Sequence, residues 1–274
     1  MRDIGLHLRL KSSLVDLVHT AYELQIPIFQ CFLISPSGFL LSPSEEEIVQ
    51  IYPKMQSFAQ RYLHASYWSN LASVRHTKHR VLMKELDLAR RLGFTHLVMH
   101  PGSAKGALNQ KEGIDAVARI LNTLLQHETE VKLVLENVAH GNMSVGGNLQ
   151  DFKLLLEKID KPEHIAFCID TAHAYSYGYD LSSKDGMERF IHEIQTTISI
   201  QKIALIHLND TYDSLGSKRD RHAAPGDGKI GEDALRHLVL DTRLRGIPLL
   251  LEPPELNQEE LWVLKQNIMQ WHNE

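Results

Sequence analysis

Side chains of the kinds that bind divalent metals stand directly after short apolar runs along this chain. Six residues follow such runs: His64, His100, Glu136, Asp170, His207 and Glu252. If these runs are parallel strands of a barrel, their carboxyl ends gather at one face, so side chains far apart in the sequence converge there. The spacing therefore predicts a metal site assembled from the ends of several strands.

Two longer polar segments supply further ligands of the same kinds. Residues 170–180 place His173 one helical turn past a strand end. Residues 209–230 contain the sequence Asp220-Arg221-His222, and in an extended segment the first and third of these side chains point the same way. Long ordered loops on the carboxyl face of a barrel usually carry function. We therefore expect His173, Asp220 and His222 to complete the donor set.

The expected donor set holds five histidines and four carboxylates. A tetrahedral zinc ion uses four protein ligands in a structural site and about three in a catalytic site. The set therefore implies two or three metal ions, and the absence of cysteine from it favours a catalytic centre that suits Zn, Mn or Fe. Ions ~4 Å apart generate hydroxide and bind both the entering and the leaving oxygen of a phosphate displacement. Hydrolysis of a phosphoester is the predicted chemistry.

The elements that must position these residues alternate between strand-like and helical patterns. Strand-like runs cover residues 4–7, 28–33, 62–64, 95–100, 132–136, 165–170, 203–208 and 248–252. Helical patterns cover residues 13–24, a capped start near Ser44, and residues 77–92, 111–127, 149–159, 185–199, 232–240 and 259–271. Eight strand–helix units favour an α/β fold with a closed (β/α)8 barrel over an open sheet. No linker divides the chain, so a single domain over residues 1–274 is expected.

Composition agrees with one large domain and limits the classes of function. The chain has 274 residues, 43% of them hydrophobic, and a net charge of −5, which argues against a histone-like binder of nucleic acid. Cys31 and Cys168 lie in apolar runs and are expected to be reduced core residues. Neither a signal-like segment nor a run of the ~20 apolar residues that span a bilayer is present. We expect a soluble cytoplasmic protein without a membrane partner.

Several motifs resemble the endonuclease IV family of apurinic/apyrimidinic endonucleases. They are the segments at 134–137, 168–174, 207–210, 220–222, 226–231 and 250–252, which read VLEN, CIDTAHA, HLND, DRH, GDGKIG and LLE. The motifs occur in the family's order over essentially the whole chain, and all nine metal positions carry the family's residue types.

The resemblance implies a centre of three zinc ions, with Mn²⁺ as an alternative in part of it. His64, His100 and Glu136 would hold the first ion, and Glu136 would bridge to a second held by Asp170, His207 and Glu252. His173, Asp220 and His222 would hold the third. Hydroxide between the first two ions would attack the phosphorus on the 5′ side of an abasic nucleotide in duplex DNA. Glu136, Asp170 and Glu252 would thus act catalytically, and the third ion would stabilise the departing 3′ oxygen.

Damaged duplex DNA is the partner that the resemblance implies. Tyr67 matches a family position that packs into the gap of bent DNA, and an abasic site makes such insertion less costly because a base is already missing. Trp68 is a further candidate for stacking, and Arg221 and Lys218 are candidates for phosphate contacts. The chain departs from the family at residues 35–39, Ser-Pro-Ser-Gly-Phe, where the family's DNA-probing arginine is absent.

Other interpretations stay open on the sequence. A metal-dependent sugar isomerase or epimerase of the related barrel superfamily would also use Glu, Asp and His at strand ends, but has little need for His173, Asp220 and His222. A homologue that binds damaged DNA with weak activity is a second alternative. Processing of blocked 3′ ends is a further expected activity, and a monomer is the family expectation.

Overall fold

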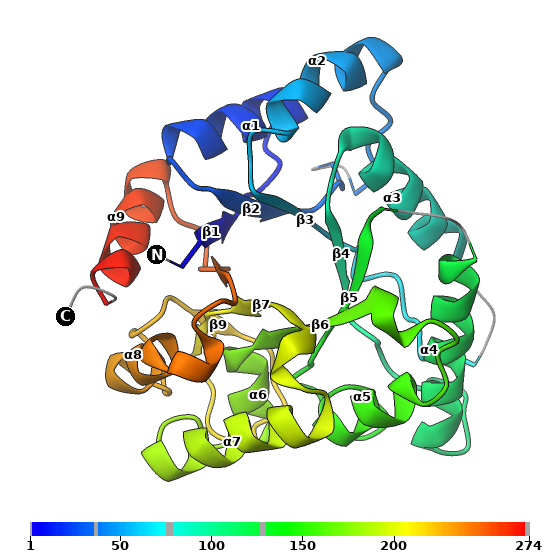
Figure 1. Cartoon of the computed structure of the whole chain (residues 1–274), viewed down its shortest axis with the longest axis vertical. Helices are drawn as coiled ribbons and strands as arrows, with labels where there is room; N and C mark the ends of the chain where they lie inside the picture. The colour runs from blue at the N-terminus through cyan, green and yellow to red at the C-terminus, as the bar shows by residue number, and fades with distance from the viewer. Residues whose placement is uncertain (1, 36–37, 75–78, 127–129, 272–274) are drawn as a thin grey trace.

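Eight parallel strands close into a barrel, and helices surround it (Figure 1). The computed structural model describes residues 2–35, 38–74, 79–126 and 130–271. The barrel strands are β1 (Ile4–His7), β2 (Ile28–Cys31), β3 (Gln60–His64), β4 (His96–Met99), β5 (Lys132–Glu136), β6 (Ile165–Asp170), β7 (Ile203–His207) and β10 (Leu249–Leu251). Their order around the barrel is β1-β10-β7-β6-β5-β4-β3-β2. The predicted (β/α)8 barrel is confirmed.

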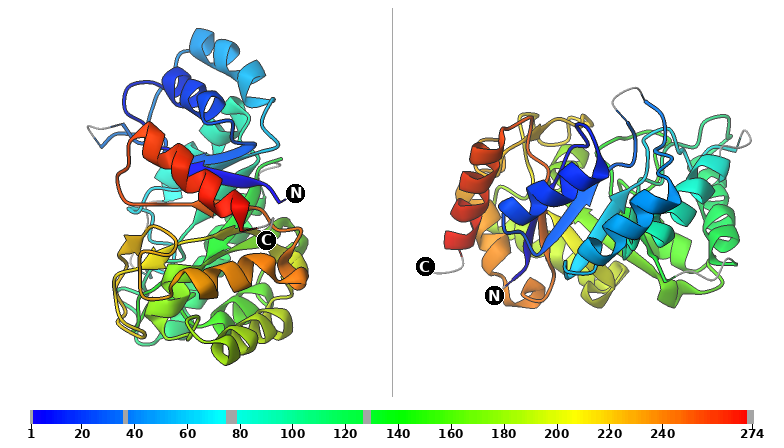
Figure 2. Two further views of the ribbon diagram at one scale, coloured as in Figure 1. Left: turned by 90° about the vertical axis from the view of Figure 1, so that its left-hand side faces the viewer. Right: turned by 90° about the horizontal axis from the view of Figure 1, so that it is seen from above.

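The helices follow the strands in sequence and cover the outside of the barrel (Figure 2). They are α1 (Leu14–Glu23), α2 (Glu45–Met55), α3 (His79–Leu92), α4 (Gln110–Leu125), α5 (Leu149–Leu156), α6 (Thr171–Tyr177), α7 (Lys184–Thr197), α8 (Glu232–Leu240) and α9 (Gln258–Gln270). Short 3-10 turns lie at η1 (Pro162–His164), η2 (Ile200–Lys202) and η3 (Thr242–Leu244). The last helix, α9, packs across β1, so the two ends of the described chain meet on the barrel wall (Figure 2, left).

Local sequence explains where several helices begin. Ser44 accepts a hydrogen bond from the Glu47 amide, and the Glu47 carboxylate accepts one from the Ser44 amide, so the capped start predicted near Ser44 is a capping box at the beginning of α2. Ser13 caps α1 through the Asp16 amide. The expected starts of α3 at residue 77 and the expected end of α4 at residue 127 lie outside the described residues.

Inward-facing positions of the strands alternate with positions that pack under the helices. One buried cluster fills the barrel interior and contains Ile28, Tyr62, Val98, Val134, Ala166, Cys168, Leu205 and Leu250. A larger cluster lies between the strands and the helices. Both cysteines are free and buried, as predicted. Within the described residues, no helix is long and apolar enough to cross a membrane.

Two segments expected to be loops have structure of their own. Residues 171–177 form α6, which continues directly from β6 because the Asp170 carboxylate accepts a hydrogen bond from the His173 amide at 2.7 Å and caps the helix. The segment after β7 contains a short antiparallel pair, β8 (Asp210–Thr211) and β9 (His222–Ala223). The second segment is therefore partly extended, as the alternation of Asp220 and His222 requires.

Candidate metal centre

The strands bring the predicted ligands together at their carboxyl ends. Each of six ligands stands two residues beyond a member of the interior cluster, as His64 does after Tyr62 and Glu136 after Val134. Successive side chains of a strand alternate between its faces, so a residue two positions further points the same way. The ligands therefore continue the inward row past the last apolar layer and stand over the barrel interior.

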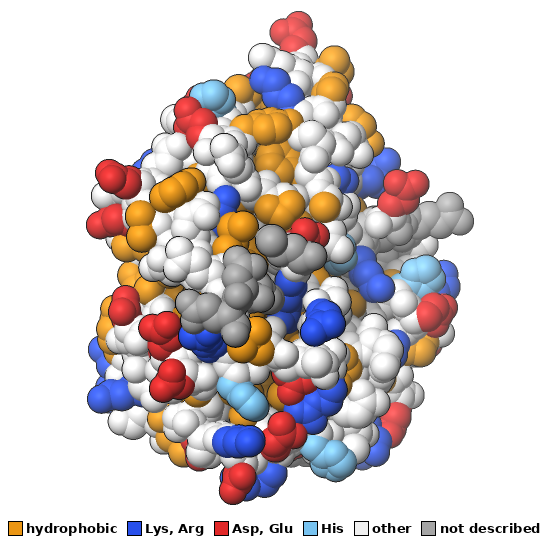
Figure 3. All heavy atoms as spheres, turned by 60° about the vertical axis from the view of Figure 1, so that its left-hand side comes forward, with side chains coloured by type: hydrophobic (Ala, Val, Ile, Leu, Met, Phe, Trp, Pro, Cys, Tyr) orange, Lys and Arg blue, Asp and Glu red, His pale blue; other side chains and the backbone are white. Residues whose placement is uncertain are grey.

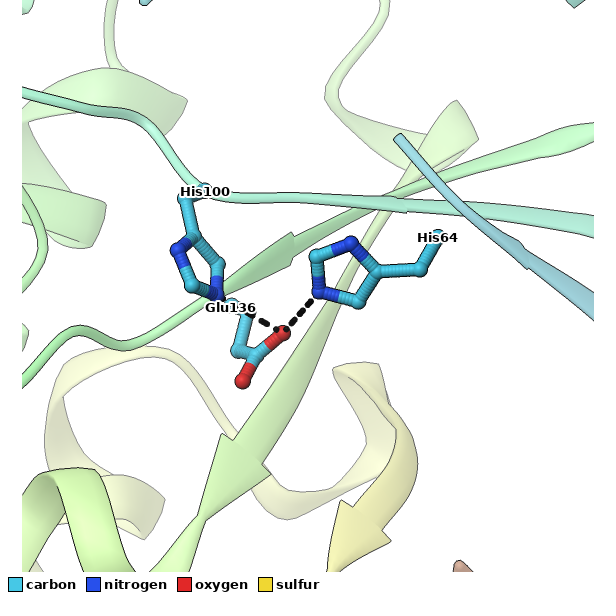
Figure 4. A group of neighbouring side chains, drawn as sticks. All are labelled: His64, His100 and Glu136. Carbon is cyan, nitrogen blue, oxygen red and sulfur yellow. Dashed lines mark hydrogen bonds and ion pairs between the residues drawn. The ribbon is translucent and has the colours of Figure 1, made fainter. Parts of the chain in front are cut away.

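The first group of ligands surrounds one carboxylate oxygen of Glu136. His64 Nε2 lies 3.2 Å and His100 Nε2 lies 3.3 Å from Glu136 Oε2 (Figure 4). The three side chains come from β3, from the residue after β4 and from β5, and Glu136 is fully buried. Their ligand atoms all lie within 4.8 Å of one another, which is compatible with one shared metal ion.

The second group uses the other oxygen of Glu136. His207 Nδ1 lies 3.2 Å from Glu136 Oε1, 3.1 Å from Glu252 Oε2 and 3.8 Å from Asp170 Oδ2. These four ligand atoms also lie within 4.8 Å of one another. Because the two oxygens of Glu136 face different groups, this carboxylate can bridge two ions.

The third group comes from α6 and from the segment leading into β9. His173 Nε2 lies 3.1 Å from Asp220 Oδ1, and His222 Nε2 lies 3.3 Å from the same oxygen. The two imidazole nitrogens are 3.4 Å apart. His222 Nε2 also lies 3.6 Å from Asp170 Oδ2, so this group adjoins the second. The structure thus assembles all nine predicted ligands into one continuous cluster.

Buried side chains hold the segment between β7 and α8, which carries two of these ligands. The Asp210 carboxylate accepts hydrogen bonds from the backbone amides of Thr211, Gly226, Gly228, Ile230 and Gly231. The Arg221 guanidinium donates two hydrogen bonds to the buried Asp213 carboxylate, at 2.9 and 2.6 Å. These contacts fix the backbone on both sides of Asp220 and His222.

Opposite charges balance one another inside the cluster. Burial opposes charge on Glu136, but His207 and His100 outweigh it and hold the pKa of this carboxyl well below its ordinary value. Burial likewise opposes charge on His173, yet Asp170 and Asp220 raise the pKa of its imidazole well above the usual range. The metal-free cluster therefore favours a carboxylate at Glu136 and an imidazolium at His173, and metal binding would release the His173 proton.

The positions of the second ring nitrogens test whether this donor set fits metal ions. A neutral imidazole that donates through one nitrogen presents a lone pair on the other. His64 Nδ1 lies 2.8 Å from the Ala65 carbonyl, His173 Nδ1 lies 2.9 Å from the Asn137 carbonyl, and His222 Nδ1 lies 3.3 Å from the Glu252 carbonyl. Each ring therefore turns Nε2 toward the cluster.

Two further observations agree with metal binding. His100 Nε2 is buried and makes no hydrogen bond within the described structure, although it points at Glu136. Cys168 also lies beside Glu136 and His207, but burial raises the pKa of its thiol to about 12. The thiol therefore stays protonated, and the nitrogen and oxygen atoms around it are the better metal donors. The residues present fit divalent ions held by nitrogen and oxygen.

The four predicted DNA-contact residues differ in the exposure of their side chains and in the contacts that these side chains make. Tyr67 is 67% exposed, and its ring centroid lies 5.6 Å from those of His64 and His100. Trp68, beside it, is also 67% exposed. Lys218 is exposed but engaged, since its ammonium lies 3.5 Å from the Tyr177 ring centroid and donates to the Tyr177 carbonyl. Arg221 is 59% exposed while its guanidinium is bound by Asp213.

Asparagine and glutamine side chains complete the surroundings of the ligands. Asn209 donates to Asp170 Oδ2 at 2.6 Å, and its oxygen accepts the Glu252 amide at 2.9 Å. Gln30, which the sequence analysis did not select, contacts both His207 and Glu252. Its signal in the sequence is its place two residues after Ile28, in the same inward row as the ligands.

Comparison with known families and relatives agrees with this geometry. The family described as xylose isomerase-like TIM barrel matches residues 22–269. A probable endonuclease 4 of Thermosipho melanesiensis is 30% identical over 267 residues, with 94% of each chain covered. A probable endonuclease 4 of Campylobacter concisus is 32% identical over 271 residues, covering 96% of this chain and 95% of the relative. An apurinic-apyrimidinic endonuclease of Caenorhabditis elegans is 28% identical and covered over 69% of its length.

Solved structures separate the family from other barrels of the same fold. Endonuclease IV from Thermus thermophilus matches with a TM-score of 0.85 at 27% identity, covering 99% of each chain. A D-allulose 3-epimerase from Methylomonas matches with a TM-score of 0.65 at 12% identity, covering 99% of this chain and 98% of its own, which shows the fold alone. The chain therefore belongs to the endonuclease IV family of xylose isomerase-like TIM barrels.

Proposed function

We propose that this chain is an apurinic/apyrimidinic endonuclease that hydrolyses the phosphodiester on the 5′ side of an abasic nucleotide in duplex DNA, using three zinc ions. The observation that carries the proposal is the third ligand group, His173, Asp220 and His222, which joins the other six ligands in one cluster. A sugar isomerase of the same fold has little use for this group. The names of the relatives, endonuclease 4 and apurinic-apyrimidinic endonuclease, support the same substrate.

The chain's own residues would hold the reacting groups in place. Glu136 would bridge the first two metal positions, since each of its oxygens faces a different histidine set. Asp170 and Glu252 would complete the second position beside it, next to the reacting phosphate. When bound, divalent ions supply the Lewis acidity that activates water and polarises a phosphodiester. Mn²⁺ in part of the sites would suit the same donors.

Recognition of the damaged duplex would depend on the side chains around the cluster. Tyr67 presents exposed aromatic surface against His64, and Trp68, the next residue, is equally exposed, so both would stack in the gap left by a missing base. Arg221 and Lys218 would contact phosphates with the N–H groups that Asp213 and Tyr177 leave free.

A net negative charge, with mixed charges on the face drawn in Figure 3, gives the protein little general attraction for DNA. On the face drawn in Figure 3, acidic and basic side chains are interspersed over the described residues. The net charge of −5 has the same consequence. Binding would therefore depend on the metal cluster and its neighbours, which favours damaged over intact duplexes.

The test is cleavage of an end-labelled duplex that contains one tetrahydrofuran abasic analogue, which blocks lyase chemistry. We expect the zinc-loaded protein to incise on the 5′ side and His222→Ala to lose most of this activity. His164→Ala, at an exposed histidine of η1, is the matched control and should cleave like the wild type. Equal cleavage by wild type and His222→Ala would reject the assigned role of the third group.

Further properties belong to the same proposal and have their own readouts. A duplex with a blocked 3′ end tests end processing, and sedimentation tests whether the protein is a monomer. A single cooperative transition in urea unfolding tests whether residues 1–274 fold as one domain. If the folded, zinc-loaded protein leaves abasic DNA intact, turnover of D-sugars would favour an isomerase, and selective binding of the duplex without cleavage would favour a damage-binding homologue.

A further inference from the structure

Two of the eight strands place a residue in the inward row that is not a predicted metal ligand. On β1 this residue is His7 and on β2 it is Gln30, whereas the other six strands supply or immediately precede a ligand. Gln30 is fully buried, and His7 has 10% of its side chain exposed. A buried amide at the rim of a metal cluster must have partners for both of its ends.

The side-chain amide of Gln30 has such partners, and both belong to the second metal position. Its nitrogen donates to Glu252 Oε1 at 2.6 Å, and its oxygen lies 3.1 Å from His207 Nε2. An ionised carboxylate only accepts hydrogen bonds, so the amide nitrogen must face Glu252. The amide oxygen must then face His207, and the imidazole must donate to it through Nε2.

This orientation decides which nitrogen of His207 faces the cluster. With the proton on Nε2, the lone pair of the neutral imidazole lies on Nδ1, which is 3.1 Å from Glu252 Oε2 and 3.2 Å from Glu136 Oε1. A lone pair between two carboxylates is favourable only if a cation stands between them. His64, His173 and His222 are oriented by backbone carbonyls instead. Within the described residues, His207 differs from them because a side-chain amide, that of Gln30, orients its ring.

We infer that Gln30 is a positioning residue for the second metal position: it fixes Nδ1 of His207 as the coordinating atom and holds the Glu252 carboxylate beside it. His7 assists beside it, since its Nδ1 lies 2.8 Å from the same Glu252 oxygen that accepts from Gln30 and 3.0 Å from the Gln30 side-chain amide nitrogen. The inference rests on the metal centre of the proposed function but not on the identity of the substrate. Gln30 is buried beneath the cluster, so it contributes to metal binding rather than to contact with DNA.

The test compares Gln30→Met and Gln30→Ala by competition for zinc against a chromophoric chelator, without DNA. Both variants lose the same two hydrogen bonds, so both should bind one zinc ion about 10- to 100-fold more weakly, with the other ions unaffected. They differ in packing, because Met fills the volume of Gln and Ala leaves a cavity, so only Gln30→Ala should be strongly destabilised as metal-free protein. Gln150→Met, which removes one glutamine hydrogen bond on α5, is the matched control and should bind zinc like the wild type.

The outcomes separate a positioning role from a structural one. Loss of zinc affinity in proportion to the loss of metal-free stability would show that Gln30 acts only through packing, and unchanged zinc affinity in Gln30→Met would overturn the inference outright. In cleavage assays at saturating zinc, we expect a lower kcat with an unchanged KM for DNA. A wild-type protein that binds zinc but spares abasic DNA would refute the proposed substrate while leaving the Gln30 effect on zinc measurable.

Discussion

Replacement of Asp210 by asparagine should loosen the segment that carries Asp220 and His222. In the folded protein, Oδ1 of Asp210 accepts from the amides of Thr211 and Ile230, and Oδ2 accepts from those of Gly226, Gly228 and Gly231. Asparagine has the same shape but carries an amino group in place of one oxygen. Backbone N–H groups facing that amino group lose their acceptor.

The loss of stability can be worked out from the number of hydrogen bonds that Asp210 Oδ1 accepts, which is the smaller of the two numbers. Asparagine would turn its amino group toward the Oδ1 position, where two amides lose their acceptor instead of three. A hydrogen bond to a charged acceptor contributes about 1.5–3 kcal/mol, so the free energy of unfolding should fall by about 3–6 kcal/mol. Because the same segment carries two ligands of the third group, the variant should also bind that metal ion more weakly.

Urea unfolding of the metal-free protein measures the first effect, and zinc content after dialysis measures the second. Asp160→Asn, at an exposed residue, is the matched control and should change the free energy of unfolding by less than about 0.5 kcal/mol. A metal-free Asp210→Asn protein as stable as the wild type would show that this carboxylate does not hold the segment. Normal stability with weaker binding of the third ion would instead mean that Asp210 acts on the ligands alone.

Two further predictions concern the barrel below the metal centre. His96 stacks on Tyr62, and burial lowers the pKa of its imidazole from 6.5 to about 4. As the pH falls from 6.5 to 4, the unfolded chain therefore binds a proton at His96 that the folded protein does not bind, and the folded state loses stability. Between pH 7 and 5, urea unfolding should show that the wild type loses about 2 kcal/mol more stability than His96→Phe, and equal losses would contradict the assignment. At Gly5, a Cβ atom would lie 2.4 Å from the Ile28 carbonyl oxygen, so Gly5→Ala should destabilise the barrel by about 1–3 kcal/mol in urea unfolding. Gly246→Ala, where a Cβ meets nothing within 4 Å, is the control, and similar stability of the two variants would disprove the crowding at Gly5.

The positions of the six predicted strand-end ligands could be inferred because two sequence signals coincide there. Apolar runs mark the strands, and a polar residue at the end of such a run is unusual enough to suggest a function. The same reasoning placed the strands Ile4–His7, Lys132–Glu136 and Ile165–Asp170 at their observed bounds. Because both faces of these strands are buried, their sequences are nearly uninterrupted runs of hydrophobic residues, which is typical of parallel strands.

The sequence indicated only in part the structure of the segments that carry the remaining predicted ligands: it did not predict α6 or the pairing of β8 with β9. Residues 171–177 contain few strong helix signals, and Asp170, a predicted ligand, also caps their helix by accepting a hydrogen bond from the His173 amide. Arg221 is a candidate phosphate contact on the sequence, and its pairing with Asp213, which the sequence does not indicate, depends on the folded path of the chain. Such pairings join residues whose proximity is set by tertiary structure, and spacing along the chain does not reveal them.

Gln30 shows why the ligand set alone does not describe this metal centre. Three of the histidine ligands are oriented by backbone carbonyls, which any sequence with this fold retains. His207 is oriented by a side chain, so a substitution at position 30 can change the second metal position without altering the barrel. The row of inward residues that supplies six predicted ligands also supplies His7 and Gln30 at the two remaining strands, so a substitution on β1 or β2 can change metal affinity while every predicted ligand stays the same.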